Sequence, residues 1–490
     1  MSRDPLDENP FRTRPAPEAA RSDRPGVTVL GTGIAHPPTA LRIGELGPRF
    51  ARFSPEKARM GYEEFVLRHM GAETVFVDEE GKGLAHFMAR AAERAMERAG
   101  VTAADVDAVV VTTATGPDVI AGTRGLVLHE LGMYEKHTIE LCSACTGFLD
   151  ALLVGRDRAA VSGDTVLVVA GDVIRSRCLD PEDYVTQALF GEGASAAVLG
   201  ACEPGFGLKL GQITTNSDWR ADAMTGPGGW FVMDAKALGT RIPAAFAEQF
   251  QRGCRRNGFD PAQTVAIPHQ ANGHLLDVLR ERLGIAPGRL VNVFHKYGNC
   301  GNPSIGIALH HAFRDGLLRR GTDAVLFGAG GGFNFGHLGF TADRELPEQT
   351  PFRVLFVDDD RRLAHAMAEE MSVAARADEE FRTLFTFHPL VEYSGEDGLR
   401  RMAEDATVNL VVTDQRMGEM SGARMVETLK RRARNVGFVL VTGFADEDRT
   451  VIEKAGFSRV LGKPCPPALL WETLKEGAKA LRNRDVNLGD

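Results

Sequence analysis

At residues 141–150 the chain reads Leu-Cys-Ser-Ala-Cys-Thr-Gly-Phe-Leu-Asp, where a β-prone run meets a helical pattern of apolar residues. A cysteine at such a strand-to-helix junction faces the positive end of the helix dipole, which favours the nucleophilic thiolate over the thiol. Cys145 is that cysteine, and the small residues Ala144 and Gly147 leave room for a substrate beside it. The stretch therefore makes Cys145 a candidate nucleophile.

Two other interpretations of this stretch stay open. Most free cysteines are buried structural thiols, and Cys145 fits that description too. Cys142 and Cys145 also form a Cys-x-x-Cys pair, which is typical of redox or zinc sites. Zinc is disfavoured because no second Cys-x-x-Cys or paired histidine follows at ligand spacing. The stretch alone does not separate a nucleophile from a structural thiol.

The composition limits the classes of protein to consider. A chain of 490 residues with 43% hydrophobic residues predicts two or three domains with a large packed interior. A formal net charge of −9 argues against binding to nucleic acid or anionic membranes. Seven irregularly spaced cysteines without a secretory signal indicate a cytoplasmic protein with free thiols. No apolar run approaches the roughly 20 residues of a membrane span.

Strands and helices alternate along most of the chain. Residues 1–26 are charged and proline-rich, which predicts a disordered arm. The glycines of Gly31-Thr32-Gly33 lack the third glycine of a dinucleotide fingerprint, so no Rossmann cofactor site is expected. The expected strands are 27–30, 106–113, 138–141, 165–170, 194–199, 207–213, 264–267, 290–294 and 324–328, and the clearest expected helices are 83–100, 122–132, 241–258 and 304–314. This alternation predicts a layered α/β domain.

Several of these strands end in polar residues or bare backbone, which is where α/β sheets commonly place chemistry. His269 lies in Pro-His-Gln-Ala-Asn, Asn299 in Tyr-Gly-Asn, and Gly331 in the Gly-Gly-Gly-Phe at residues 330–333. Taken separately, His269 is equally well a core histidine and Asn299 a turn residue.

Together with Ala-Cys-Thr-Gly-Phe at residues 144–148 and Phe-Gly-Glu-Gly-Ala at 190–194, these motifs resemble 3-oxoacyl-ACP synthase III. The resemblance covers residues 27–341 and implies a thiolase-like fold with two similar halves, usually a homodimer. It also implies a β-ketoacyl synthase III-like acyltransferase that takes substrates from acyl-CoA or acyl carrier protein. No redox cofactor is expected.

The residue types suit this chemistry. The Cys145 thiolate accepts an acyl group from a thioester. A malonyl unit then loses carbon dioxide, and His269 and Asn299 donate hydrogen bonds to the resulting enolate oxygen. The enolate carbon attacks the acyl-cysteine, and the backbone N–H groups of Cys145 and, by resemblance, Gly331 hold the tetrahedral oxyanion. Glycine suits position 331 because no side chain blocks the approach of substrate.

Two departures from the family pattern bear on the substrate. Family members that prime fatty-acid synthesis carry a Trp-Ile-x-x-Arg-Thr-Gly-Ile stretch, and its tryptophan and arginine help to hold coenzyme A. At the comparable place, residues 65–72, this chain has Phe-Val-Leu-Arg-His-Met-Gly-Ala. Those members also follow His-Gln-Ala-Asn closely with an arginine that helps to dock the carrier protein, where this chain has Gly273 and His274. Both departures favour a specialised acyl donor in secondary metabolism or an unusual lipid pathway.

A second pattern begins after a polar, proline-containing linker at residues 342–351. The expected strands 353–357, 408–413, 437–441 and 459–461 are followed by acids, a hydroxyl and a lysine, and a helix at 467–481 closes the pattern. The residues at the strand ends are Asp358, Asp359, Asp414, Thr442 and Lys463. Converging carboxylates repel one another unless a hard cation such as Mg²⁺ binds. The alternative is that each acid caps a following helix.

The full set resembles the receiver domain of response regulators, over residues 352–481, with residues 482–490 as a tail. The resemblance implies a flavodoxin-like, doubly wound fold and a cognate histidine kinase as partner. It also implies Asp414 as phosphoacceptor, Asp358, Asp359 and Asp414 as Mg²⁺ ligands, and Thr442 and Lys463 as the groups that contact the phosphoryl oxygens. Gly418 stands where the family commonly has proline, and Val460 where many members have an aromatic switch residue.

The leading hypothesis is a cytoplasmic condensing enzyme with a phosphorylation-responsive domain at its C-terminal end. One alternative is a synthase-fold acyltransferase that moves the acyl group onto an oxygen or nitrogen acceptor. Another is a signalling scaffold that binds acyl thioesters without turnover. The combination of Cys145, His269 and Asn299 favours an enzyme over the scaffold.

Overall fold

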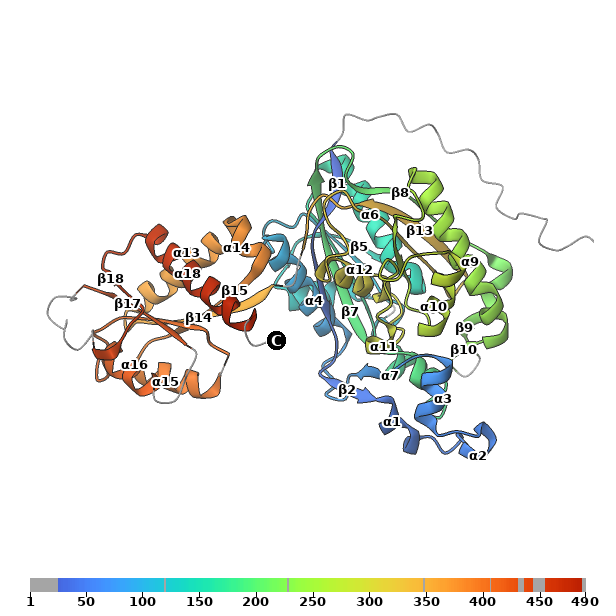
Figure 1. Cartoon of the computed structure of the whole chain (residues 1–490), viewed down its shortest axis with the longest axis horizontal. Coiled ribbons are helices and arrows are strands. Elements are labelled where there is room, and N and C mark those ends of the chain that lie inside the picture. Colours follow the sequence, from blue (N-terminus) through green and yellow to red (C-terminus); the bar gives the residue numbers. More distant parts are fainter. Residues whose placement is uncertain are drawn as a thin grey trace, which may run out of the picture.

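The computed structural model describes residues 25–118, 120–226, 229–346, 349–405, 407–430, 436–443 and 454–486. Figure 1 shows two bodies, a larger one formed by the first part of the chain and a smaller one formed by the last part. Residues 1–24 of the expected disordered arm and 487–490 of the expected tail lie outside the described residues. The last helix ends at Val486 and so runs into the region predicted to be a tail.

Two sheets form the centre of the larger body. The first has the order β1-β7-β6-β4-β5, with β4, β5 and β6 parallel and β7 antiparallel to its neighbours. The second has the order β11-β12-β13-β8. The strands are β1 (Gly26–Ala35), β4 (Ala108–Thr112), β5 (His137–Leu141), β6 (Val166–Asp172), β7 (Gly193–Cys202), β8 (Gly207–Thr215), β11 (Val265–Pro268), β12 (Asp323–Gly330) and β13 (Asn334–Thr341).

Helices separate and cover these sheets. Helices α6 (Gly147–Ser162) and α12 (Ser304–Arg314) pack in one core with strands of both sheets. Helix α4 (Leu84–Ala99) covers the outer face of the first sheet, and α9 (Ala235–Asn257) and α10 (Gly273–Arg282) cover that of the second. The order helix, sheet, helix, sheet, helix is the thiolase-like architecture and confirms the predicted layered α/β fold (Figure 1).

The glycines at positions 31 and 33 have a packing role. A Cβ at Gly31 would lie 2.3 Å from the Ala95 carbonyl oxygen, and one at Gly33 would lie 2.1 Å from that of Ala91. Both strand residues must therefore be glycine for α4 to rest directly on β1. Helix α4 ends at Gly100 in the left-handed conformation, as the sequence pattern predicted.

One predicted strand is wrong. Residues 290–294 make only a single bridge, between Leu290 and Ala266, and then enter the short helix α11 (Phe294–Tyr297). The Gln270 side chain takes the place of a partner strand, because its amide nitrogen donates to the Val291 carbonyl oxygen at 3.1 Å and its oxygen accepts from the Val293 N–H at 2.8 Å. The backbone of this segment is satisfied without a sheet.

The remaining elements of the larger body are short. They are β2 (Thr39–Arg42), β3 (Thr74–Val77), β9 (Ala223–Thr225), β10 (Phe231–Met233), α1 (Ile43–Leu46), α2 (Pro55–Ala58), α3 (Tyr62–His69), α5 (Arg124–Glu130), α7 (Ile174–Cys178) and α8 (Thr186–Leu189), with 3₁₀ turns at Gly47–Arg49, Ala144–Thr146 and Ser217–Asp222. The sequence analysis did not anticipate β2, β3, β9, β10 or β13, which lack a clear two-residue alternation of apolar residues.

The smaller body is a five-stranded parallel sheet of order β15-β14-β16-β17-β18. Helices α13 and α18 pack on one face, and α15 and α16 on the other, which confirms the doubly wound, flavodoxin-like fold. The elements are β14 (Thr350–Val357), α13 (Arg361–Ala377), α14 (Glu379–Leu384), β15 (Phe385–Glu392), α15 (Gly395–Glu404), β16 (Leu410–Thr413), α16 (Gly422–Lys430), β17 (Gly437–Thr442), β18 (Arg459–Gly462) and α18 (Pro467–Val486).

The two bodies touch at the C-terminal end of α4. The Arg382 guanidinium of α14 donates to the Ala99 carbonyl oxygen at 3.1 Å, where a cation also complements the negative end of the helix dipole. His388 Nε2 of β15 lies 3.6 Å from Glu97 Oε1. Burial raises the pKa of Glu97 to about 7. Polar and charged groups thus join the bodies.

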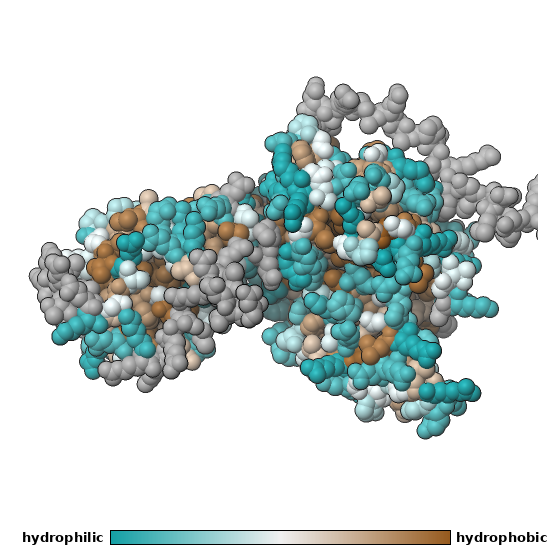
Figure 2. Space-filling model, viewed as in Figure 1, coloured by the Kyte–Doolittle hydropathy of each residue, from teal (hydrophilic) through white to brown (hydrophobic). Residues whose placement is uncertain are grey.

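Hydrophilic residues cover most of the face seen in Figure 2, and hydrophobic residues show mainly in the gaps between them. None of the helices in the described ranges is both long and apolar enough to cross a bilayer.

Candidate active site

Cys145 lies in a single 3₁₀ turn, Ala144–Thr146, between β5 and α6. Tight contacts hold this turn in place. A Cβ at Gly147 would lie 1.8 Å from Asn302 Oδ1, and one at Gly330 would lie 2.8 Å from the Cys145 nitrogen. Ala144 has a φ of 46°, a left-handed conformation that is unfavourable for alanine and sharpens the turn. The close approach of β12 and of the turn before α12 thus fixes the backbone of the candidate nucleophile.

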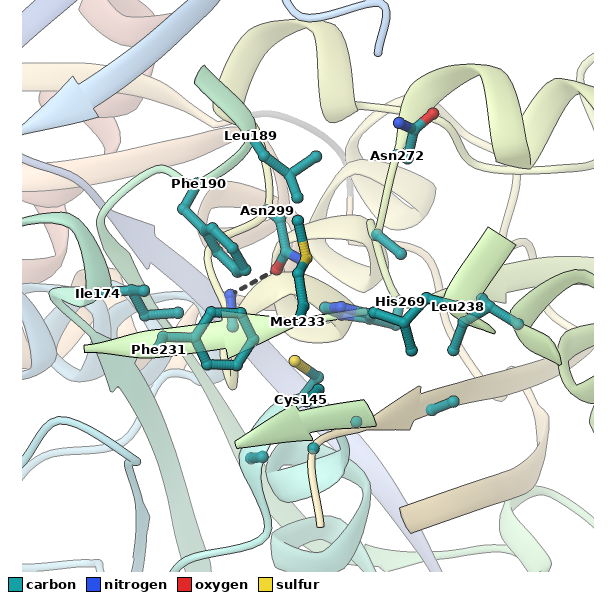
Figure 3. Close-up of a pocket in the computed structure, with 18 of the residues that line it drawn as sticks. Cys145, Ile174, Leu189, Phe190, Phe231, Met233, Leu238, His269, Asn272 and Asn299 are labelled. Carbon is teal, nitrogen blue, oxygen red and sulfur yellow. Dashed lines mark hydrogen bonds between the residues drawn. The ribbon is translucent and has the colours of Figure 1, made fainter. Parts of the chain in front are cut away.

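Cys145 faces a cavity of about 1020 Å³ (Figure 3). His269, Asn299 and Gly331 line the same cavity, so the structure brings all four predicted site residues of the larger body together. Most of the other lining is apolar and comes from α7, α8, the β10 strand, α9 and α10. These residues include Ile174, Leu189, Phe190, Phe231, Met233, Leu238, Ile242, Leu275 and Val278.

His269 follows β11, and its backbone N–H donates to the Phe327 carbonyl oxygen of β12 at 2.8 Å. Its side chain is buried, and its Nδ1 has no hydrogen-bond partner. Burial lowers the pKa of His269 to about 3. The imidazole is therefore neutral near pH 7, and a neutral imidazole has one N–H to donate.

The side chain of Asn299 is held by its own turn. The Gly301 N–H donates to Asn299 Oδ1 at 2.9 Å, the bond drawn as a dashed line in Figure 3. Because Oδ1 is the acceptor, the amide orientation is set by this bond and Nδ2 is the group left to donate elsewhere. The Asn299 backbone is fixed to Leu189 and Gly191 by hydrogen bonds of 2.9 and 3.1 Å.

The sequence predicted that the helix dipole would favour the Cys145 thiolate, and the structure corrects this. Burial, followed by the charge of Asp172, raises the pKa of Cys145 to about 12. Hydrogen bonding by the backbone of Gly331 and of Cys145 itself opposes this shift but does not cancel it. Cys145 is therefore a thiol in the resting protein, and it must lose its proton during acyl transfer.

The sequence analysis missed several residues of the cavity. Asp172, the last residue of β6, lines it and is fully buried. Its position at a strand end in Gly-Asp-Val was a usable signal, whereas the apolar lining carried none. Phe65 and His69, from the stretch that departs from the family pattern, also line the cavity, as does His274, which the sequence analysis did not assign to the site. The exposed His274 ring places Nε2 2.6 Å from the Leu67 carbonyl oxygen.

The polar site of the smaller body is also assembled. Carboxylate oxygens of Asp358, Asp359 and Asp414 lie within 4.8 Å of one another at the ends of β14 and β16. Lys463 Nζ lies 2.7 Å from Asp358 Oδ2 and 3.1 Å from Asp414 Oδ2. Thr442 is buried at the end of the neighbouring strand β17.

Charge balance at this site fits a divalent cation. Burial alone would lower the pKa of Lys463, but hydrogen bonds and charges from Asp358 and Asp414 outweigh it and raise that pKa. The three carboxylates face only the one ammonium group of Lys463, so negative charge is in excess at this site. Carboxylate oxygens are also the ligands that Mg²⁺ prefers. The donor set therefore fits the predicted Mg²⁺ site, with Asp358, Asp359 and Asp414 as its ligands.

The two unusual positions of the smaller body have different explanations. Gly418 has a φ of 58°, which proline cannot adopt, so this loop takes a path that requires the departure from the family pattern. Val460 is 42% exposed on β18. It cannot provide an aromatic ring that turns between buried and exposed positions.

Family comparisons agree with this geometry. The 3-oxoacyl-[acyl-carrier-protein] synthase III family matches residues 139–218, and its C-terminal domain matches 254–340. A β-ketoacyl-[acyl-carrier-protein] synthase III of Streptomyces coelicolor is 31% identical over 297 residues, which cover 57% of this chain and 89% of the relative. The chain belongs to the 3-oxoacyl-ACP synthase III family. It is a β-ketoacyl synthase III-like acyltransferase with a response regulator receiver domain, whose family matches residues 354–475.

Solved structures place the synthase part in the same family. The 3-oxoacyl-(acyl carrier protein) synthase III of Pseudomonas aeruginosa superposes with a TM-score of 0.60 at 28% identity, covering 66% of this chain and all of that one. The priming β-ketosynthase of the R1128 polyketide biosynthetic pathway superposes with a TM-score of 0.60 at 25% identity, covering 67% of this chain and all of that one. The receiver family instead matches residues 354–475, beyond the part of the chain that matches the synthase family.

Proposed function

We propose that this chain catalyses a decarboxylative Claisen condensation through an acyl group on Cys145, with Asp414 of the receiver as a phosphorylation site. The observation that carries the proposal is that Cys145, His269 and Asn299 line one largely apolar cavity. Under this proposal residues 27–341 form the synthase, 342–351 the linker and 352–481 the receiver.

The first step is acyl transfer from a thioester to Cys145. The sulfur of Cys145 forms a bond to the acyl carbon, the bond to the carrier sulfur breaks, and the Cys145 proton passes to the departing thiol. One thioester replaces another, so the reaction is close to balanced in free energy. The backbone N–H groups of Gly331 and Cys145 are the proposed donors to the tetrahedral oxyanion. Their hydrogen bonding at the Cys145 sulfur is consistent with this role.

The second step joins two carbons. A malonyl thioester loses carbon dioxide, and its enolate oxygen accepts hydrogen bonds from neutral His269 and from Asn299 Nδ2. The enolate carbon then attacks the acyl carbon, the bond to Cys145 breaks, and the Cys145 thiolate that leaves takes up one proton from solvent. The low pKa of His269 supports its role as a neutral hydrogen-bond donor, because the imidazole needs no proton from solvent to act.

The acyl donor proposed here carries a bulky apolar chain and belongs to secondary metabolism or an unusual lipid pathway. The apolar walls formed by Ile174, Phe190, Phe231 and Met233 lie beside Cys145 in Figure 3 and support an apolar chain. The similar priming ketosynthase of a polyketide pathway supports a specialised role. Acyl-CoA or acyl carrier protein delivers the chain, and the proposed assembly is a cytoplasmic homodimer.

The experiment that tests this function exposes the protein to a panel of acyl thioesters of increasing chain length and measures its intact mass. We expect a single acyl group on Cys145, formed fastest with a chain longer than acetyl, and a 3-oxoacyl product after malonyl thioester is added. Bound thioester without any covalent adduct would support the scaffold alternative. Product with an oxygen or nitrogen acceptor, but not with malonyl thioester, would support the other acyltransferase alternative.

For the receiver we propose that a cognate histidine kinase phosphorylates Asp414, with Thr442 and Lys463 contacting the phosphoryl oxygens. Mg²⁺, when bound by Asp358, Asp359 and Asp414, neutralises charge on the carboxylates and the phosphoryl group. The receiver contacts α4 at Glu97 and Ala99, and the other end of α4 packs against Gly171, where Met88 Cγ would lie 2.5 Å from an added Cβ. A change in the contact between the receiver and α4 can therefore be passed through α4 to β6, the strand that ends in Asp172.

We expect that Mg²⁺ with a small-molecule phosphodonor changes the condensation rate of the wild type by about 5-fold, as a coupling near 1 kcal/mol would give. Asp414→Asn should not respond, because it cannot form the acyl phosphate. Asp397→Asn, an acid on α15 outside the phosphorylation site, is the matched control and should respond like wild type. Phosphorylation of the wild type is confirmed by mass. Equal rates in every condition would leave the receiver as a docking module.

A further inference from the structure

Asp172 is the most heavily hydrogen-bonded side chain of the cavity. Its Oδ1 accepts from Thr113 Oγ1 at 3.0 Å, the Ala114 N–H at 2.8 Å and Thr115 Oγ1 at 3.0 Å. Its Oδ2 accepts from the N–H and the Nδ2 of Asn302, at 2.8 and 2.7 Å. The carboxylate therefore joins the loop after β4 to the turn between α11 and α12.

Asn302 of this network is connected to Asn299 through Gly301. Gly301 lies between them in the left-handed conformation, with a φ of 71°, and a Cβ there would lie 2.5 Å from Asp172 Oδ2. The Gly301 N–H is the donor that fixes Asn299 Oδ1. On its other side, Asn302 Oδ1 accepts from Thr112 Oγ1 at 2.8 Å. The position of the Gly301 N–H, and with it the direction of Asn299 Nδ2, depends on how firmly Asn302 is held.

From this geometry we propose that Asp172 is a positioning residue for condensation, because it holds the Gly301–Asn302 turn and so aims Asn299 Nδ2 at the enolate oxygen. The inference rests on the proposed function of Asn299. Asp172 needs no contact with substrate for this role. A displacement of about 1 Å at a catalytic hydrogen-bond donor is enough to slow a reaction about 100-fold.

The charge state of Asp172 suits this role. Burial raises the pKa of Asp172, and hydrogen bonds from Asn302, Ala114 and Thr115 oppose that shift. Three of the five donors are N–H groups that can only donate, so both oxygens must act as acceptors, as in an ionised carboxylate. An alanine at position 172 would remove the acceptor of all five bonds, leave the Ala114 and Asn302 N–H groups without it, and loosen the Asn302 turn.

The test compares wild type, Asp172→Ala, Asn299→Ala and the double variant in two single-turnover measurements. The first is acylation of Cys145 followed by mass, and the second is formation of the 3-oxoacyl product from isolated acyl-enzyme and malonyl thioester. We expect Asp172→Ala to slow condensation about 10- to 100-fold while acylation changes less than about 3-fold. The double variant should condense no more slowly than Asn299→Ala alone, because Asp172 acts through Asn299.

Two further variants keep the test decisive. Asp343→Ala removes another buried carboxylate, which accepts a hydrogen bond from Thr28 and does not line the cavity, and it should leave both steps unchanged. If Asp172→Ala does not fold, Asn302→Ala is the second variant. It removes the Nδ2 bond to Asp172 and the Oδ1 bond from Thr112, but keeps the bond from the Asn302 N–H to Asp172, and it should give the same pattern with a smaller loss. The inference would be overturned if the loss of condensation rate in the double variant equalled the product of the losses in the two single variants. It would also be overturned if Asp172→Ala slowed acylation and condensation equally. Normal condensation by Asn299→Ala would instead overturn the proposed function on which it rests.

Discussion

Cys145→Ala should abolish acyl transfer, with at least about a 10⁴-fold loss of 3-oxoacyl product, because the variant lacks the thiol that is proposed to carry the acyl chain. The fold should be retained. Alanine is smaller than cysteine, and the turn that carries position 145 is held by its backbone and by Gly147 and Gly330 rather than by the sulfur. The measurements are the intact mass after exposure to acyl thioester, the rate of product formation and the thermal unfolding temperature.

A second measurement on the same variant separates the two half-reactions. His269 and Asn299 remain in Cys145→Ala, so malonyl thioester should still lose carbon dioxide, now without condensation. The matched control is Cys178→Ala, which removes another thiol that lines the cavity and should still become acylated at Cys145. If Cys145→Ala forms product at a rate near that of wild type, another nucleophile carries the acyl group.

Much of this site was predictable from sequence, because each predicted residue follows a recognisable strand or motif. His269 follows β11, and Gly331, Asp414 and Lys463 also follow predicted strands that the structure contains, whereas the strand predicted before Asn299 did not form. Parallel strands bring such residues to one edge of a sheet, so spacing along the chain translates into proximity. The comparisons confirm the family and both folds that the motifs predicted.

The environment of each group was less predictable, since it depends on distant residues. The N-terminal position of Cys145 on a helix suggested a thiolate, but burial and Asp172 raise its pKa to about 12. The helix dipole acts over one turn and is weaker than the loss of solvation in an enclosed cavity. Nothing local to residues 141–150 shows that Asp172 lies beside them, because β6 reaches the site from another part of the chain.

The failed strand at residues 290–294 has a similar cause. Its apolar run satisfied the pattern for a buried strand, but the hydrogen bonds that it would make to a neighbour go to the side chain of Gln270. Gln270 was visible only as part of the Pro-His-Gln-Ala-Asn motif. In the structure it holds the segment that leads to Asn299 beside the one that carries His269.

The second large effect is expected from Asn299→Ala, which should accumulate acyl-enzyme without making product. Acylation of Cys145 should stay within about 5-fold of wild type, because the enolate forms only in the later step. Condensation should fall about 10²- to 10³-fold, the usual loss when one donor to a developing oxyanion is removed. The measurement is a time course of acyl-enzyme by mass beside that of 3-oxoacyl product.

His269→Ala should give the same division between the two steps, because neutral His269 and Asn299 Nδ2 are proposed to donate to the same oxygen. His337→Gln is the matched control, since His337 is also buried with a pKa lowered to about 3 but lies on β13 and bonds Gln249 instead. That variant should acylate and condense like wild type. Equal losses of acylation and condensation in both Asn299→Ala and His269→Ala would show that these residues act before the enolate forms, and the assignment of the second step to them would be wrong.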